Sequence, residues 1–215
     1  MGAQAHSGEV DWWSAYPLPQ PTKGSHVRVN FVSSADGSVT VDGRSGGLGG
    51  KNDRALMKVL RTLSDVVMVG AGTVRTEGYG GLSLSEPLLE QRKALGLSPI
   101  PRIAIVSGSL DLRPGMSVFT KAEARPLIIT HAAAPSVRRE ALSGVADVLV
   151  CGETEVELDV VLAQLSALGL SRVLCEGGPG LFGSLLEADL VDEVCLTVSP
   201  LFVAGVDSRI AHSKV

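Results

Sequence analysis

The chain has 215 residues, of which 45% are apolar and 20% are charged, with 25 glycines and a formal net charge of −4. This composition favours one globular domain with a sizeable core and excludes a disordered or fibrous chain. The charge leaves no broad basic surface for nucleic acid or an anionic membrane, and the aliphatic runs are far shorter than the roughly 20 residues of a membrane-spanning helix. We therefore expect neither nucleic acid nor a membrane as a partner.

The first residues combine acids, glutamines and three prolines, with no basic flank followed by an apolar run. This pattern is not that of a secretory signal. We interpret residues 1–26 as an extended arm that covers a sheet edge or a neighbouring subunit, and residues 27–215 as one domain.

The chain contains three cysteines, an odd number with no C-x-x-C spacing: Cys151, Cys175 and Cys195. A disulfide framework or a structural zinc site is therefore not expected, and we interpret all three as buried thiols. A cytoplasmic location follows from this and from the absence of a signal pattern.

Short β-branched runs alternate along the chain with segments of helical periodicity. The predicted strands are residues 27–32, 65–70, 102–107, 126–130, 147–151, 172–175 and 192–198. The run at 65–70 is apolar on both faces, which predicts a central strand. This alternation is typical of α/β proteins with a mostly parallel sheet.

Two segments have the periodicity of amphipathic helices that pack on a sheet. The first has apolar residues from Leu56 to Leu63 and follows Asn52 and Asp53, both candidates for its N-cap. The second runs over 158–168, and Gly169 stands where a glycine would end it. Further helices are predicted at residues 85–95 and 135–142. We expect the helix at 85–95 to pack loosely, because it is crowded with polar residues.

A glycine-rich turn follows the predicted strand at 172–175 and leads into a helix. Glu176 is followed by Gly177, Gly178, Pro179 and Gly180. Glycines let the backbone approach an anion closely, and the N-terminus of the helix favours negative charge. The alternative is a tight turn without a ligand. Because the spacing is not G-x-G-x-x-G, an ordinary Rossmann dehydrogenase fits poorly.

A second glycine turn, around Gly70 and Gly72, follows the predicted central strand. Next to it, Thr73 could cap a helix or hold a phosphate, and Glu77 could bind a ribose hydroxyl or be a solvated acid. Residues 45–50 are so rich in glycine that we expect this loop to close over a ligand.

Several chemistries are excluded by their missing motifs. No zinc-protease, EF-hand, α/β-hydrolase or P-loop motif occurs, and the four histidines have no second ligand at metal spacing. We therefore predict no metal site. Neither tyrosine is followed by lysine at helical spacing, which argues against a short-chain dehydrogenase.

Four segments, taken in order, resemble the reductase domain of the bifunctional riboflavin-biosynthesis deaminase-reductases. They lie at 30–37, 64–74, 175–179 and 190–193, and the resemblance extends from about Val27 to Ala204. It implies the dihydrofolate-reductase-like fold, a three-layer α/β/α arrangement with a mostly parallel central sheet. It also implies a homodimer.

The resemblance implies reduction of 5-amino-6-(5-phosphoribosylamino)uracil by NADPH, with hydride transfer to C1 of the ribose. Carried over residue by residue, the substrate contacts are Ser45, Arg61 and Glu176, where Arg61 meets the phosphate and Glu176 binds amino or hydroxyl groups. Glu176 is also the candidate catalytic residue. The implied cofactor contacts are Val32, Gly47, Thr73, Glu77, Gly178, Pro179, Gly180, Leu181, Phe182, Gly183 and Ser184. Either Arg75 or Lys51 would offset the charge of the additional phosphate of NADPH.

The sequence departs from the family pattern in three respects. It has no H-x-E or P-C-x-x-C zinc motif, so only the reductase activity is implied. The loop at 46–50 lacks the aromatic residue and the Thr-Ser pair of many members. The sequence stops at Val215, where relatives continue through further edge strands, so we expect either an incomplete sequence or a missing sheet edge.

Two alternatives to this activity remain open. The first is a related pteridine or dihydrofolate reductase, because the same fold accepts both heterocycles. The second is a non-catalytic module that binds NADPH. Turnover with each substrate separates these possibilities.

Overall fold

The computed structural model describes residues 10–22, 24–204 and 209–212. Seven strands form one sheet in the order β5-β4-β3-β2-β6-β1-β7, with all neighbouring pairs parallel. The strands are β1 (His26–Ser34), β2 (Val66–Gly70), β3 (Arg102–Val106), β4 (Leu127–Thr130), β5 (Asp147–Val150), β6 (Arg172–Cys175) and β7 (Glu193–Ser199). The seven predicted strands are confirmed, and β2 lies in the middle of the sheet as predicted.

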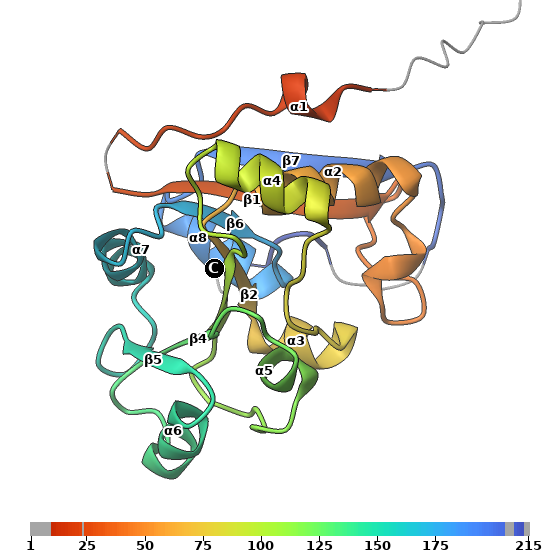
Figure 1. Cartoon of the computed structure of the whole chain (residues 1–215). Coiled ribbons are helices and arrows are strands. Elements are labelled where there is room, and N and C mark those ends of the chain that lie inside the picture. The colour runs from red at the N-terminus through yellow and green to blue at the C-terminus, as the bar shows by residue number, and fades with distance from the viewer. Residues whose placement is uncertain (1–9, 23, 205–208, 213–215) are drawn as a thin grey trace, which may run out of the picture.

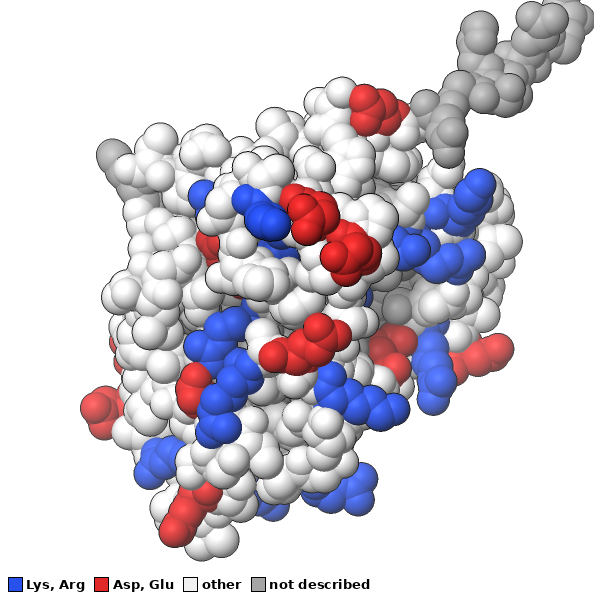
Figure 2. Space-filling model, viewed as in Figure 1, with Lys and Arg blue, Asp and Glu red and all other residues white. Residues whose placement is uncertain are grey.

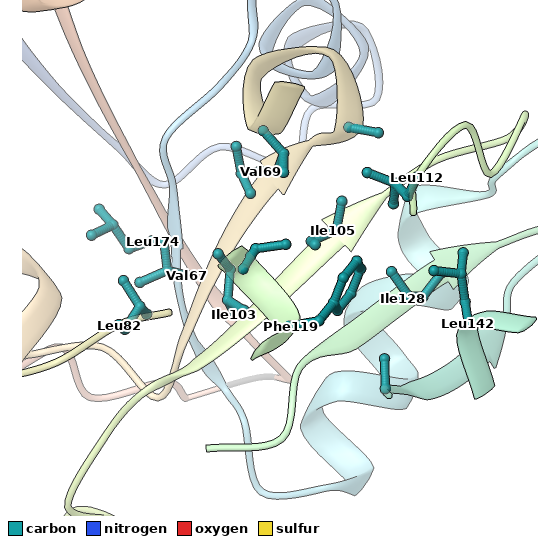
Figure 3. Close-up of a cluster of buried hydrophobic side chains, with 14 of the residues drawn as sticks. Val67, Val69, Leu82, Ile103, Ile105, Leu112, Phe119, Ile128, Leu142 and Leu174 are labelled. Atoms are coloured by element: carbon teal, nitrogen blue, oxygen red, sulfur yellow. The ribbon is translucent and has the colours of Figure 1, made fainter. Parts of the chain in front are cut away.

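Helices cover both faces of the sheet, which confirms the three-layer architecture (Figure 1). Side chains alternate along β2, so that Val66 and Met68 join one apolar cluster while Val67 and Val69 join the other. The first cluster is completed by α7 (Leu158–Ala167) and α8 (Pro179–Glu187). The second lies against α2 (Lys51–Thr62), α3 (Ala71–Glu77), α4 (Glu86–Ala94), α5 (Ser117–Thr120) and α6 (Ser136–Ser143), and Figure 3 shows its side chains.

The two helices predicted from periodicity are present, but the start of the first was predicted wrongly. Helix α2 begins at Lys51 with Gly50 as its N-cap, so Asn52 and Asp53 lie inside the first turn. A carboxylate there still favours the helix, because the N-terminus carries partial positive charge. The end of α7 is as predicted, since Gly169 has a φ of +75° directly after the C-cap residue.

Helix α4, for which loose packing was predicted, is held by Arg92, its one buried residue. The Arg92 side chain is fully buried and donates hydrogen bonds to the carbonyls of Thr62 (2.8 Å), Ser64 (2.6 Å) and Ser98 (2.6 Å). The Thr62 carbonyl is at the end of α2, where helical carbonyls lack backbone partners, and Ser64 follows the C-cap residue. Burial lowers the pKa of Arg92 to about 10. Helical periodicity cannot indicate an arginine that turns inward for this purpose.

The described part of the N-terminal arm is extended except for one short helix, α1 (Trp12–Ala15). The Asp11 carboxylate caps it by accepting the backbone N–H groups of Trp13 and Ser14. The arm lies against its own sheet, because Arg172 Nε donates to the Pro19 carbonyl at 3.0 Å and Arg28 stacks on the Tyr16 ring. The prediction that this segment is extended is therefore wrong for α1, which forms one helical turn.

Charge is mixed on the face shown in Figure 2, where basic and acidic side chains lie next to one another. The helices of the described residues are all too short or too polar to cross a membrane.

Candidate active site

A cavity of about 1000 Å³ opens at the carboxyl ends of β1, β2, β3 and β6. Its walls come from the ends of these strands, the loops that follow them, one side of α2 and the first turn of α8. Ligands of open parallel sheets bind at this edge, because the loops there are free to vary while the strands hold them in place.

The Glu176 carboxylate, which follows β6, has three hydrogen-bond donors around it. Arg61 donates from Nε to Oε1 at 2.6 Å and from Nη2 to Oε2 at 2.7 Å, and the Tyr79 hydroxyl donates to Oε2 at 2.7 Å. The Glu176 side chain is only 4% exposed. Two of the expected substrate contacts therefore form a bidentate ion pair with each other.

The surroundings of this pair fix the charge of both donors. Burial opposes the charged form of Arg61, but the Glu176 charge and hydrogen bonds outweigh it and hold the pKa of Arg61 above its ordinary value. Burial, and then the Glu176 charge, raise the pKa of Tyr79 well above its ordinary value. Arg61 is therefore a cation, and Tyr79 a neutral donor, over the physiological pH range.

The glycine turn after Glu176 packs closely against the end of β2. Gly70 donates its N–H to the Gly177 carbonyl at 2.7 Å, and the Gly177–Gly178 peptide is cis. A Cβ on Gly178 would lie 2.6 Å from Thr73 Oγ1, so only glycine fits without displacing Thr73. Helix α8 then begins at Pro179 without a side-chain cap, which leaves N–H groups of its first turn available to an anion.

Helix α3 reaches the glycine-rich loop through Glu77, whose Oε1 accepts the Ser45 N–H at 2.9 Å. The interpretation of Thr73 as a cap is wrong, because α3 begins at Ala71 with Gly70 as its N-cap. Glu77 is not a solvated acid either, since this hydrogen bond holds the loop.

Most of the expected site residues line the cavity. These are Val32, Ser45, Arg61, Thr73, Glu77, Glu176, Gly178, Pro179, Gly180, Leu181 and Ser184. Three others do not line it: Phe182 stacks on Phe31 within the core, Gly183 lies against the His212 backbone, and Gly47 packs on Val41.

Sequence reasoning did not identify several polar residues of the cavity, among them Tyr79 and Asn30. The register of β1 and β6 pairs Val29 with Cys175, which places Asn30 next to Glu176 at the end of the ladder. The Asn30 Oδ1 atom is buried and has no hydrogen-bond partner within the described chain. No spacing in the sequence relates either residue to Glu176. Among described residues, no three His, Cys, Asp or Glu side chains gather as a metal site.

Comparison with known proteins gives a consistent match. The family model of the RibD C-terminal domain matches residues 25–214. A 2,5-diamino-6-ribosylamino-4(3H)-pyrimidinone 5′-phosphate reductase of Archaeoglobus fulgidus is 33% identical over 85% of this chain and 84% of its own. The riboflavin biosynthesis protein RibD of Mycobacterium tuberculosis is 29% identical over 95% of this chain, which spans 52% of that relative.

A solved structure gives the same match in three dimensions. The pyrimidine reductase-like protein of Corynebacterium diphtheriae superposes with a TM-score of 0.81 at 30% identity, covering 88% of this chain and 80% of its own.

Proposed function

The chain belongs to the RibD C-terminal domain family, and from this premise we propose that it uses NADPH to reduce the ribosylamino group of a pyrimidine 5′-phosphate to a ribitylamino group. The hydride goes to C1 of the sugar. One observation carries this proposal. The same cavity is lined by an uncapped, glycine-lined helix N-terminus and by the Arg61–Glu176 ion pair.

The residues of the cavity fit a dinucleotide on one side. The uncapped first turn of α8 suits a diphosphate that approaches the backbone. The Thr73 hydroxyl lies at the same place and can donate to it. When bound, the nicotinamide supplies the hydride, which amino-acid side chains cannot donate.

The other side of the cavity fits the phosphorylated substrate. Arg61 uses one Nε–H and one Nη2–H on Glu176, so its second Nη2–H and its two Nη1–H groups are left for a phosphate or a hydroxyl. Within the described residues, Oε1 of Glu176 accepts only the Arg61 Nε–H, and it therefore retains capacity for an amino or hydroxyl group of the substrate. Ser45 approaches from the glycine-rich loop that Glu77 holds.

Turnover of purified protein tests the proposal. NADPH oxidation, followed by absorbance, is expected with 5-amino-6-(5-phosphoribosylamino)uracil or with the 2,5-diamino-pyrimidinone named for the Archaeoglobus relative. The two differ by an oxo or amino group at one ring position, so their kcat/KM values identify the preferred substrate. Turnover of dihydrofolate or a pteridine instead would indicate a related reductase. Tight NADPH binding without any turnover would indicate a binding module.

The preference for NADPH over NADH is expected to depend on Arg75. Arg75 lines the cavity and is 43% exposed, whereas Lys51 is not among the described residues that line it. We expect Arg75→Ala to weaken NADPH binding by about tenfold, because a charge-assisted hydrogen bond to the additional phosphate is lost, and to leave NADH binding unchanged. Fluorescence titration with both cofactors measures this, and Lys51→Ala is the control. Equal weakening of both cofactors contradicts the assignment.

The proposal includes a homodimer formed through the exposed face of β7. This strand ends the sheet order, and its outward side chains Val194, Leu196 and Val198 are 47%, 45% and 60% exposed. An edge strand with an apolar face is a common surface for pairing with a second copy. Sedimentation is expected to give twice the monomer mass, and Leu196→Asp is expected to give the monomer. A wild-type monomer at micromolar concentration contradicts the dimer.

We also propose a cytoplasmic location. All three cysteines are free and buried, and thiols persist in reducing compartments. Cell fractionation tests this, and recovery of the protein outside the cytoplasm contradicts it.

A further inference from the structure

We propose that Tyr79 is a positioning residue for the reduction: its hydroxyl holds Glu176 in the one orientation in which Oε1 is open to the substrate. The inference rests on the proposed function, because it concerns the substrate side of the same cavity. It adds a residue that neither the sequence pattern nor the family resemblance indicates.

The backbone of Tyr79 is held firmly enough to serve this purpose. Gly78, with a φ of +70°, ends α3 in the left-handed conformation, and the Tyr79 N–H returns to the Val74 carbonyl at 3.2 Å. Ser117 Oγ donates to the Tyr79 carbonyl at 3.0 Å, and the ring packs against the apolar cluster of α3 and α5. A side chain supported on both sides of its backbone can hold a partner in a fixed geometry.

The hydrogen bond from Tyr79 makes the two carboxylate oxygens of Glu176 unequal. Arg61 donates one hydrogen bond to each oxygen, and this symmetric fork alone does not distinguish them. Tyr79 adds a second donor to Oε2 only. A carboxylate oxygen accepts about two hydrogen bonds. Oε2 is therefore saturated, while Oε1 keeps an acceptor position for an N–H or O–H group of the substrate.

In this arrangement the Tyr79 hydroxyl acts as a hydrogen-bond donor to Glu176. Its hydroxyl proton is already shared with Glu176, and burial followed by the Glu176 charge raises the pKa of Tyr79 well above its ordinary value. It remains a neutral donor throughout the pH range in which the enzyme would be assayed. Its role is therefore to orient Glu176, which in turn contacts the substrate.

The residues that precede Tyr79 in the chain indicate which ligand a substitution of Tyr79 should affect. Thr73 faces the glycine turn at the cofactor side, Glu77 holds the glycine-rich loop, and Tyr79 alone of the three contacts Glu176. Removing only the Tyr79 hydroxyl leaves Thr73 and Glu77 in place. We therefore expect substrate kinetics to change while NADPH binding is retained.

The test is the Tyr79→Phe variant, which keeps the ring and removes the donor. For the preferred pyrimidine, kcat/KM is expected to fall about tenfold, the typical effect of one hydrogen bond to a charged group. The NADPH dissociation constant should stay within about twofold of wild type. Tyr16→Phe, in the arm outside the cavity, is the matched control and should leave both measurements unchanged.

A double-mutant cycle with Glu176→Gln shows whether Tyr79 acts through Glu176. If it does, Tyr79→Phe has almost no further effect on kcat/KM once Glu176 is replaced. Fully additive effects, unchanged kinetics of Tyr79→Phe, or a parallel loss of NADPH binding would each overturn the proposal. Wild-type turnover is the reference: its absence refutes the proposed function, whereas its presence with normal Tyr79→Phe kinetics refutes only the role of Tyr79.

Discussion

Replacing Glu176 by glutamine is expected to lower kcat/KM for the pyrimidine by about a hundredfold, which corresponds to about 2.7 kcal/mol of transition-state stabilisation. The carboxylate accepts two hydrogen bonds from Arg61 and one from Tyr79. In glutamine, one of these oxygens becomes an NH₂ group that faces a donor. Arg61 then loses its counter-charge at a site where Glu176 is 4% exposed. Alanine should cost more, because both donors then remain without an acceptor.

A second ion pair, at the opposite end of β6 from Glu176, provides a matched control for this variant. Asp65 pairs with Arg172 at 3.0 Å where β2 and β6 begin, at the end of the sheet opposite the cavity. Its side chain is 10% exposed, so Asp65→Asn also removes a largely buried charge. We expect Asp65→Asn to lower the melting temperature with normal kcat/KM. Glu176→Gln should lower kcat/KM and leave NADPH titration close to wild type. Unchanged turnover contradicts the substrate role of Glu176, and loss of NADPH binding alone assigns it to the cofactor.

Most of the sheet was predictable from the sequence because strand signals are local. Each strand is a short β-branched run bounded by glycine, proline or charge, and the apolar run of β2 indicated its central place. The errors occurred where a side chain acts against its usual preference. Arg92 turns into the core to cap another helix, and Gly50 takes the N-cap place that Asn52 or Asp53 would ordinarily occupy.

The glycine turns that line the cavity were also predictable, since glycines after a strand are a local signal. The contacts of Glu176 with Arg61 and Tyr79 were not. The hydrogen bonds of Glu176 join residues 115 and 97 positions away in the chain. Only the order of the strands brings these elements together. In the sheet, β6 lies next to β2; in the chain, Arg61 precedes β2 and Tyr79 follows it.

The contact between Glu176 and Arg61 bears on the ligand recognition that we propose for both residues. A sequence that shows an arginine and a glutamate at a predicted site suggests two independent contacts, one to a phosphate and one to amino or hydroxyl groups. In the structure they share one ion pair, so a change in either alters the other. Single substitutions at Arg61 and Glu176 should therefore not be additive.

The Gly178→Val variant is expected to lower NADPH affinity by at least about tenfold, or roughly 1.4 kcal/mol. The reason is the close approach of Gly178 to α3, since its Cβ would lie 2.6 Å from Thr73 Oγ1. A branched side chain must push Thr73 aside, and it stands at the N-cap of α8, next to the first turn where the diphosphate is proposed to bind. The φ of Gly178 is −69°, which any residue adopts, so the change introduces crowding without backbone strain of the left-handed kind.

Calorimetric titration with NADPH measures the loss, and thermal unfolding shows whether the domain persists. Gly115→Val is the matched control, because a Cβ there meets nothing within 4 Å and the residue lies outside the cavity lining. The NADPH affinity of Gly178→Ala should lie between those of wild type and Gly178→Val, since one methyl group displaces Thr73 less. We expect the folded domain to survive with a modest drop in melting temperature. If Gly178→Val unfolds while Gly115→Val does not, the turn is chiefly structural, and if it binds NADPH with wild-type affinity, the cofactor lies elsewhere in the cavity.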